Sequence, residues 1–342
     1  MSNNLNWTQP DLARMQCPNS GGKLTLSNDS AVQFAVSSDS HRYEVDSDIL
    51  KFLDYDATTE SESESIESYA KIISYYDQAI EWLFASTLTK ESALRQKMVD
   101  ELWLDSDSRV VEVGAGTGRD SIEILQRLGQ AGQLYVQDIS MEMLRSARLR
   151  LSECDHQATC RLFQGSATKL PFDDGALDAL YSFGGLNEFG NVNRVLAEFS
   201  RVVRVGGRVV VGDEGIAPWL EGSEHHRILA ANNHIFFSNE LPIDSLPENA
   251  ADVRVQWVLG NAFYLISFTV GAGRPPLDLD IEHLGRRGGT LRTRYFGALD
   301  GVDPSLRKLV ELAALRSGMS LRRWLETTLG AAVNTTQSGE SR

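Results

Sequence analysis

The chain has few cysteines and no long apolar segment, and each scarcity excludes a class of protein. Its 342 residues include only Cys17, Cys154 and Cys160, too few for a disulfide framework, so a reducing, cytoplasmic location is expected. No apolar run approaches the roughly 18 residues that a membrane-spanning helix needs. The N-terminus also lacks the apolar core of a signal peptide. The sequence therefore predicts a cytoplasmic protein without a membrane segment.

Positive charge is scarce as well. There are 33 lysines and arginines against 47 acidic residues, a formal net charge of −14. This balance argues against non-specific binding to nucleic acid or to anionic membranes, although a local basic patch is compatible with it. An apolar content of 42% and a charged content of 23% are typical of a globular protein.

The most informative feature that is present is the run VVEVGAGTGRD at residues 110–120. Four residues typical of a buried strand lead into Gly114, Gly116 and Gly118, and a helical pattern of apolar residues follows at once. Glycines allow positive φ and a close approach of the backbone to a ligand, and the helix presents free N–H groups at its start. The run predicts a cradle for a nucleoside-like cofactor.

Spacing and charge narrow the choice of cofactor. The glycines follow G-x-G-x-G rather than the G-x-G-x-x-G of dinucleotide sites, and Glu112 would repel a pyrophosphate but attract an ammonium group. A second predicted strand, residues 133–137, ends at Asp138. A carboxylate at that strand end can accept hydrogen bonds from both hydroxyls of a ribose.

These motifs resemble the class I S-adenosylmethionine-dependent methyltransferases, in particular those of ubiquinone and menaquinone biosynthesis. The resemblance runs through QDISMEML (137–144) and the segments 161–183 and 183–215. It implies an α/β fold: a Rossmann-like, seven-stranded, mostly parallel sheet with an antiparallel last strand. The predicted closing strand pair, residues 253–260 and 262–270, fits that fold.

The resemblance also implies which residues hold S-adenosyl-L-methionine. Glu112 and the loop of Gly114, Ala115, Gly116 and Gly118 would hold the methionine end. Asp138 would bind the ribose, Ile139 would pack on the adenine, and Ser166 and Ala167 would meet the adenine edge. Ser166 stands where the family usually has an acidic residue. Tyr69, Tyr75 and Tyr76 lie where the family has a lid helix; Tyr76 is the expected cofactor contact, and simple packing of these tyrosines is the alternative.

The remaining segments divide the chain further. Residues 1–53 resemble a degenerate zinc ribbon that keeps only Cys17; with His41 it supplies two of the four ligands that tetrahedral zinc needs, so no metal is expected. Residues 54–67 are interpreted as an acidic linker. The methyltransferase domain is expected at 68–272, with a substrate-side insertion at 216–250. A helical appendage would follow at 273–333 and a disordered tail at 334–342.

Catalytic candidates come from the insertion and from the loop after the fourth predicted strand. His225, His226 and His234 lie in the insertion, and a histidine is a natural base for an oxygen or nitrogen acceptor; a polar helix surface is the alternative. Glu188 lies in the loop. The sequence predicts methyl transfer to a small organic acceptor by in-line displacement at the sulfonium methyl group, without a metal.

The competing interpretation rests on the C-terminal region. Between Arg286 and Arg323 there are nine basic residues against three acidic ones, and TLRTRYF with the helices after it weakly resembles a ribbon-helix-helix DNA-binding unit. The alternative function is a non-catalytic regulator or scaffold associated with nucleic acid. The sequence favours instead an appendage that packs on the catalytic domain or pairs two copies as a homodimer.

Overall fold

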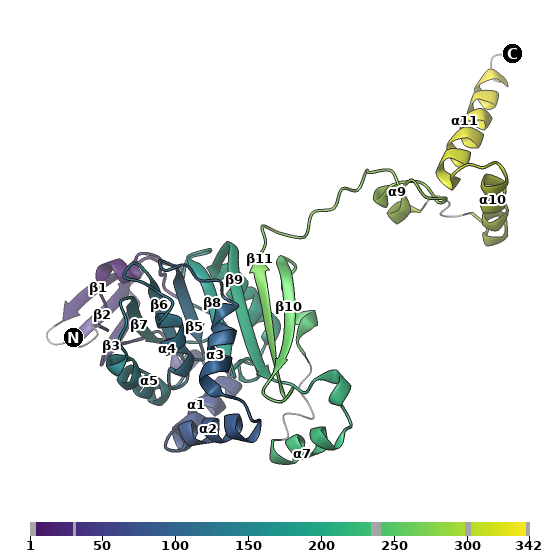
Figure 1. Ribbon diagram of the computed structural model, residues 1–342. Helices are drawn as coiled ribbons and strands as arrows, with labels where there is room; N and C mark the ends of the chain where they lie inside the picture. Colours follow the sequence, from purple (N-terminus) through teal and green to yellow (C-terminus); the bar gives the residue numbers. More distant parts are fainter. Residues whose placement is uncertain (1–4, 30–31, 234–240, 298–301, 340–342) are drawn as a thin grey trace. The chain divides into compact units, whose positions relative to one another are not determined.

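The computed structural model describes residues 5–29, 32–233, 241–297 and 302–339 (Figure 1). The chain divides into two compact units, Met1–Pro275 and Pro276–Arg342. No helix of the described residues combines the length and the apolar character that crossing a bilayer requires.

In the described residues, the first unit is built on one sheet of eleven strands in the order β1-β2-β3-β4-β7-β6-β5-β8-β9-β11-β10. The strands are β1 (Leu24–Asp29), β2 (Val32–Ser37), β3 (Arg42–Asp46), β4 (Ile49–Lys51), β5 (Arg109–Val113), β6 (Gln133–Asp138), β7 (Thr159–Gln164), β8 (Leu177–Phe183), β9 (Val203–Glu214), β10 (Ala250–Val258) and β11 (Phe263–Val270). Strands β7, β6, β5, β8 and β9 run parallel, and β11 lies antiparallel between β9 and β10. The predicted seven-stranded Rossmann-like sheet is confirmed.

The N-terminal strands differ from the small separate module that the sequence predicts, because they extend the same sheet. Strand β4 pairs in parallel with β7, with Ile49 opposite Leu162 and Lys51 opposite Gln164. An open edge of β7 would leave backbone N–H and C=O groups unpaired, and β4 satisfies them. A buried ion pair between Asp11 and Arg161, 2.7 Å long, further joins the module to β7.

Helices cover both faces of this sheet (Figure 1). The helices described in this unit are η1 (Gln9–Leu12), η2 (Tyr55–Ala57), α1 (Glu60–Ile72), α2 (Tyr76–Ser86), α3 (Glu91–Asp100), α4 (Arg119–Leu125), α5 (Met141–Glu153), η3 (Leu186–Glu188), α6 (Val192–Val202), η4 (Pro218–Leu220), α7 (Glu224–Asn232) and η5 (Ile243–Ser245). The last three fall in the predicted insertion, of which residues 234–240, with His234, lie outside the described residues.

The segment interpreted as an acidic linker differs in the structure, because most of it is the start of α1. Thr59 caps this helix: its backbone N–H donates to the Glu62 carboxylate at 2.9 Å, and its hydroxyl accepts from the Glu62 N–H at 3.2 Å. Acidic side chains in a first turn are also favoured by the helix dipole. Charge density alone therefore gave the wrong prediction for this segment.

Two apolar clusters hold the sheet between its helices. Val111 and Val113 of β5 belong to one cluster, with Phe199 of α6, and Val110 belongs to the other, with Leu144 of α5. Successive side chains of a strand point to opposite faces, so the same strands supply both clusters. This packing fixes the strand ends that carry the site.

The second unit is helical, with α9 (Leu291–Phe296), α10 (Pro304–Arg316) and α11 (Leu321–Gly339). TLRTRYF forms helix α9 rather than the strand that a ribbon-helix-helix unit requires, which corrects that interpretation. Asp303 caps α10 as its sequence predicts, accepting from the Ser305 N–H at 2.9 Å. The second predicted helix continues past Leu329 to Gly339, through most of the predicted tail; residues 340–342 lie outside the described residues.

Candidate functional site

The glycine-rich loop joins β5 to α4 at the carboxyl edge of the parallel strands. Gly114, Gly116 and Gly118 have φ of 68°, 54° and 77°, in the left-handed region that other residues avoid. A Cβ at Gly116 would lie 3.4 Å from the Tyr76 hydroxyl, and one at Gly118 would lie 3.2 Å from the Ala147 Cβ. The loop therefore needs glycine both for its backbone conformation and for its close neighbours.

Asp138 lies at the end of the neighbouring strand β6 and is tied to the same loop. Its carboxylate accepts hydrogen bonds from the backbone N–H of Gly116 and of Ser140, both at 2.8 Å. Burial raises its pKa to about 6. A carboxylate has about four lone-pair positions, so the two backbone bonds leave acceptor capacity on each oxygen.

These strand ends form two adjoining hollows. The first is lined by Glu62, Ser65, Tyr69, Tyr76, Gly114, Gly116, Gln137, Asp138, Ile139, Ala167, Gly184, Gly185, Glu188 and Phe189. The second shares Tyr69, Tyr76, Gly114, Gly184 and Glu188 with it, and adds Glu112 and Ala115 among others. The structure thus brings together all but two of the residues predicted to hold the cofactor; Gly118 and Ser166 line neither hollow.

Two tyrosines on α1 and α2, which both precede β5 in the chain, cover the first hollow. Tyr69 of α1 and Tyr76 of α2 meet edge to face, with ring centroids 6.3 Å apart. Tyr75 does not line either hollow and is 51% exposed. Of the three candidate lid tyrosines, the structure therefore places two over the glycine loop.

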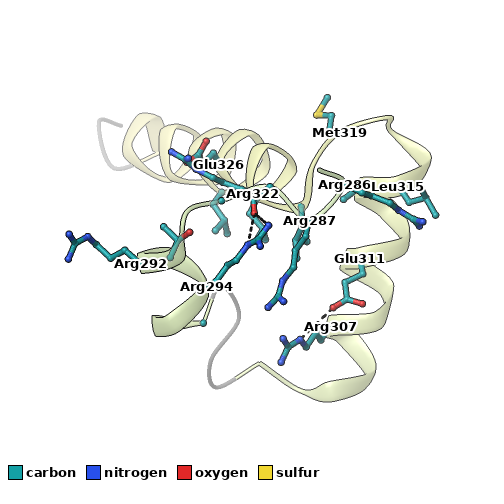
Figure 2. A pocket seen from close by; sticks show the side chains of 18 residues that line it. Arg286, Arg287, Arg292, Arg294, Arg307, Glu311, Leu315, Met319, Arg322 and Glu326 are labelled. Atoms are coloured by element: carbon teal, nitrogen blue, oxygen red, sulfur yellow. Dashed lines mark hydrogen bonds and ion pairs between the residues drawn. The ribbon is translucent and has the colours of Figure 1, made fainter. Parts of the chain in front are cut away.

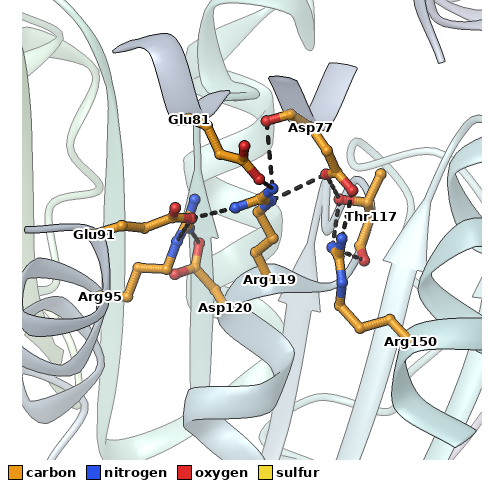
Figure 3. A network of polar contacts seen from close by, with 8 residues as sticks. All are labelled: Asp77, Glu81, Glu91, Arg95, Thr117, Arg119, Asp120 and Arg150. Carbon is orange, nitrogen blue, oxygen red and sulfur yellow. Dashed lines mark hydrogen bonds and ion pairs between the residues drawn. The ribbon is translucent and has the colours of Figure 1, made fainter. Parts of the chain in front are cut away.

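A network of charged side chains anchors α2 on the glycine loop (Figure 3). Asp77, next to Tyr76, accepts from the Thr117 hydroxyl at 2.7 Å and from Arg119 Nε at 3.0 Å. Arg150 bonds the same carboxylate and donates to the Thr117 carbonyl oxygen at 2.6 Å. The cluster fixes the start of α2, and with it the ring of Tyr76.

Glu62 is a cavity residue that sequence analysis missed. It is 9% exposed, lines the first hollow, and accepts a hydrogen bond from the Ser166 hydroxyl. The resemblance implies an acidic residue at the position of Ser166, and here a carboxylate from α1 reaches the Ser166 hydroxyl. The Thr59-x-x-Glu62 spacing of a capping box was the available signal for a helix start here.

Carboxylates dominate the second hollow. Burial and the neighbouring Asp120 raise the pKa of Glu112, which accepts from the Ser121 hydroxyl. Asp120 forms a 2.7 Å ion pair with Arg95, and both side chains are nearly buried. Burial also raises the pKa of Glu188, while hydrogen bonds from Tyr69 and Ser65 act in the opposite direction. Arg95 and Arg119 also line this hollow, so its charged groups are of both signs.

Comparisons with known proteins agree with this geometry. The model of a family described as "Methyltransferase domain" matches residues 110–207. This segment holds strands β5 to β8 and the glycine loop. Residues 110–207 are a methyltransferase domain.

Individual relatives match a similar part of the chain. A demethylmenaquinone methyltransferase of Desulfitobacterium hafniense is 31% identical over 116 residues, which are 34% of this chain and 46% of that protein. The demethylmenaquinone methyltransferase of Deinococcus radiodurans is 31% identical over 146 residues, 39% of this chain and 59% of that protein. The chain therefore spans about half the length of these relatives. The predicted resemblance to the methyltransferases of menaquinone biosynthesis is confirmed for this part of the chain.

Among solved structures, one likeness is to the phosphoethanolamine N-methyltransferase 2 of Haemonchus contortus in complex with S-adenosyl-L-methionine. The TM-score is 0.47 at 12% identity, over 63% of this chain and 61% of that one.

The structure does not bring the predicted catalytic histidines to the methyltransferase domain's hollows. His225 and His226 lie on α7; His225 Nε2 is 3.1 Å from the Gly260 carbonyl oxygen, and the Gly222 N–H donates to His226 Nδ1 at 3.1 Å. Neither residue lines the hollows, whose described lining contains no histidine. Glu188, the other catalytic candidate of the sequence, lines both hollows.

The ribbon segment ahead of the methyltransferase domain gathers three groups of metal-ligand type. Cys17, Asp39 and His41 place one ligand atom each within 4.8 Å of one another. The Cys17 sulfur is also 3.0 Å from the Tyr43 hydroxyl, and His41 Nδ1 lies 3.1 Å from Asp39. Sequence analysis counted Cys17 and His41 but not Asp39.

Proposed function

We propose that this chain is an S-adenosylmethionine-dependent methyltransferase that acts on a small organic molecule. The observation that carries the proposal is the cavity at the carboxyl ends of the parallel strands, in which Gly116, Asp138 and Tyr76 meet. Ligands of open α/β sheets bind at this edge. The matched family and the named relatives support the same reaction class.

The residues present fit this cofactor. The Asp138 oxygens keep free lone pairs for two ribose hydroxyls, and Ile139 offers an apolar contact to the adenine face. Glu112 is a buried carboxylate beside the loop that forms no ion pair with the described residues, and burial makes an uncompensated anion costly. The methionine end of the cofactor carries a positively charged α-amino group, which would lower that cost.

We propose that the Glu62 carboxylate accepts a hydrogen bond from the edge of the adenine. The exocyclic amino group of adenine is a hydrogen-bond donor, and a carboxylate is an acceptor only. Glu62 is nearly buried and is oriented by Ser166 and by the capping of α1, so its position is defined by the fold. This role would replace the acidic residue that the loop at Ser166 lacks.

The acceptor is proposed to occupy the second hollow, of about 240 Å³. Ile72, Ile80, Leu83 and Phe263 give it an apolar wall, which suits a small molecule with an apolar body. The relatives are named for demethylmenaquinone, so quinol-like aromatic molecules are the first acceptors to screen.

S-adenosylmethionine supplies an electrophilic methyl group on a sulfonium whose leaving group is a neutral thioether. The protein then has to align the acceptor and exclude water, which Tyr69 and Tyr76 do by covering the glycine loop. An acceptor that must lose a proton would pass it to the Glu188 carboxylate. The raised pKa of Glu188 makes it a stronger base than an ordinary carboxylate.

Calorimetric titration with S-adenosylmethionine and S-adenosylhomocysteine, with NAD as control, tests the cofactor. Micromolar binding of the first two and none of NAD is expected. Turnover of a demethylated quinol or another aromatic acceptor would then establish the enzyme. Binding without turnover of any acceptor would favour the regulator or scaffold alternative. A cytoplasmic location and a homodimer stay predictions of the sequence.

A further inference from the structure

The second unit contains a cavity that the proposed methyl transfer does not use. It encloses about 900 Å³ and is lined by six arginines against two glutamates, Glu311 and Glu326. The arginines are Arg286, Arg287, Arg292, Arg294, Arg307 and Arg322. In Figure 2, Arg287, Arg294 and Arg307 extend into the hollow, whereas Arg292 points away from it. The lining is strongly basic in a chain whose net charge is −14.

The loop that carries two of these arginines is held in place. The Gly288 carbonyl oxygen accepts from Arg294 Nε at 3.1 Å and from Arg294 Nη2 at 3.0 Å, and the His283 N–H donates to the Gly289 carbonyl oxygen at 2.9 Å. Both glycines have positive φ, and a Cβ at Gly288 would lie 2.6 Å from the Ser320 hydroxyl. The fold therefore presents Arg286 and Arg287 on a fixed turn pressed against the start of α11.

The arginines differ in how their charge is compensated. Arg292 pairs with Asp280 at 2.8 Å and Arg322 with Glu326 at 2.8 Å, and Arg307 lies 3.6 Å from Glu311. Within the described ranges, no ion pair is recorded for Arg286 or Arg287. Figure 2 shows Arg286 and Arg287 extending in different directions, with Arg287 directed into the hollow. A guanidinium group without a carboxylate can bind the oxygens of a phosphate or carboxylate through parallel N–H groups.

Part of the cavity lining is apolar. It is formed by Ala314, Leu315, Met319, Leu321, Leu325 and Leu329 of the α10–α11 hairpin. Only Ala314 and Leu325 of these are buried, while Leu315 is 42% and Leu329 58% exposed. A contiguous apolar wall of this kind gains free energy when an apolar group covers it.

We propose that this cavity binds an amphiphilic anion: a phosphate or carboxylate head group at Arg287, on the loop that Arg286 shares, with an apolar chain along the leucines of α10 and α11. The basic loop and the apolar wall are then two parts of one site. Double-stranded nucleic acid fits less well, because its phosphate backbone offers nothing apolar to the leucines that line the cavity.

The test is calorimetric titration of the full chain with decyl phosphate below its micelle concentration, beside inorganic phosphate and decanol. Binding of decyl phosphate that is clearly tighter than that of either part is expected. The double variant Arg286→Gln/Arg287→Gln should weaken it by about tenfold or more, the loss expected for two charge-assisted hydrogen bonds. The matched control is Arg316→Gln/Arg323→Gln, which removes two arginines of the same unit that do not line the cavity and should change little.

A second variant, Leu325→Ser, tests whether the apolar lining contributes to the binding of decyl phosphate. The helix content of each variant, measured by circular dichroism, shows whether its C-terminal unit is folded. Equal loss in both arginine pairs would overturn the proposal, as would equal affinity for inorganic and decyl phosphate. Binding only to vesicles of phosphatidylglycerol, with none of free decyl phosphate, would assign the arginines to a membrane surface instead. Binding only to duplex DNA would restore the nucleic-acid interpretation, and either result rejects the small amphiphile.

Discussion

The two units of this chain carry cavities of opposite construction. In the Met1–Pro275 unit, carboxylates and glycine backbone line hollows that rest on a sheet with an apolar cluster on each face. In the Pro276–Arg342 unit, arginines line a cavity beside helices α10 and α11, and the described apolar side chains that are buried are Ala314 and Leu325. The first cavity is shaped by its core, whereas the second is shaped by its surface side chains. We therefore expect the proposed cofactor site of the first unit to be preorganised, and the side chains of the proposed anion site in the second unit to adjust more readily to a ligand.

The largest effect should come from the core that makes the first cavity rigid. Leu144→Ala removes a fully buried side chain from α5 and should lower the free energy of unfolding by about 2–5 kcal/mol. Leu309→Ala, on α10 where the side chain is 62% exposed, should change it by no more than about 0.5 kcal/mol. Urea denaturation of both variants measures the contrast. Equal losses would show that the two units are packed alike.

The next effect concerns the Asp138 carboxylate. Asp138→Ala should weaken S-adenosylhomocysteine binding by about 1.5–3 kcal/mol, or one to two orders of magnitude, because charge-assisted hydrogen bonds to the ribose are lost. Calorimetry measures the change. The control is Asp107→Ala, which removes an exposed carboxylate just before β5. Unchanged affinity in Asp138→Ala would reject the ribose assignment.

The same residue predicts a pH dependence. Since burial raises the pKa of Asp138 to about 6, the carboxylate takes up a proton as the pH falls through that value. Wild-type affinity for S-adenosylhomocysteine should therefore fall below pH 6 and level off above it. Asp138→Asn should lack this step.

The anchoring of α2 is expected to matter less than the carboxylate itself. Asp77→Ala removes the acceptor shared by Thr117, Arg119 and Arg150, so Tyr76 loses its support and cofactor affinity should fall by about tenfold. Glu81→Ala is the matched control, because Glu81 meets Arg119 from a 65% exposed position. Similar losses in both variants would mean that the network acts only through its net charge.

Glu62 offers a test of base recognition. S-inosylhomocysteine presents a carbonyl oxygen in place of the adenine amino group, so the wild type should prefer the adenosyl compound by about tenfold. Glu62→Gln should narrow that preference, since an amide can donate as well as accept. Glu64→Gln, on the exposed side of α1, should leave it unchanged. A preference that survives in Glu62→Gln would place the adenine edge elsewhere.

The smallest effect is expected at the histidines of the insertion. His225→Ala and His226→Ala should change kcat/KM by less than about twofold, because neither side chain lines the hollows. A general base typically contributes about 10²–10⁴-fold. A loss of that size in either variant would return the catalytic role to the insertion and show that α7 moves during turnover.

Local sequence was sufficient for the parts of the site that follow one another along the chain. The three glycines and Asp138 lie at strand ends whose apolar residues identify the strands, so the cofactor edge could be located without a structure. Glu62 could not be found in this way, because its segment is acidic and serine-rich and its partner Ser166 lies 104 positions further on. The catalytic role of His225 and His226 stays a prediction: residue type suggests a base, but neither side chain lines the two hollows.

The sequence by itself determined the strand that leads into the glycine loop, the strand that ends at Asp138 and the composition of the loop, because hydrophobic periodicity and glycine spacing act over a few residues; the class of fold followed from the family resemblance of these motifs. Only the tertiary structure decided that β4 extends the sheet at β7, that α1 brings Glu62 to the cavity, and that six arginines of the second unit line a common hollow. Those arrangements depend on burial and pairing between segments far apart in the chain, and local patterns do not encode which distant partner a segment will meet.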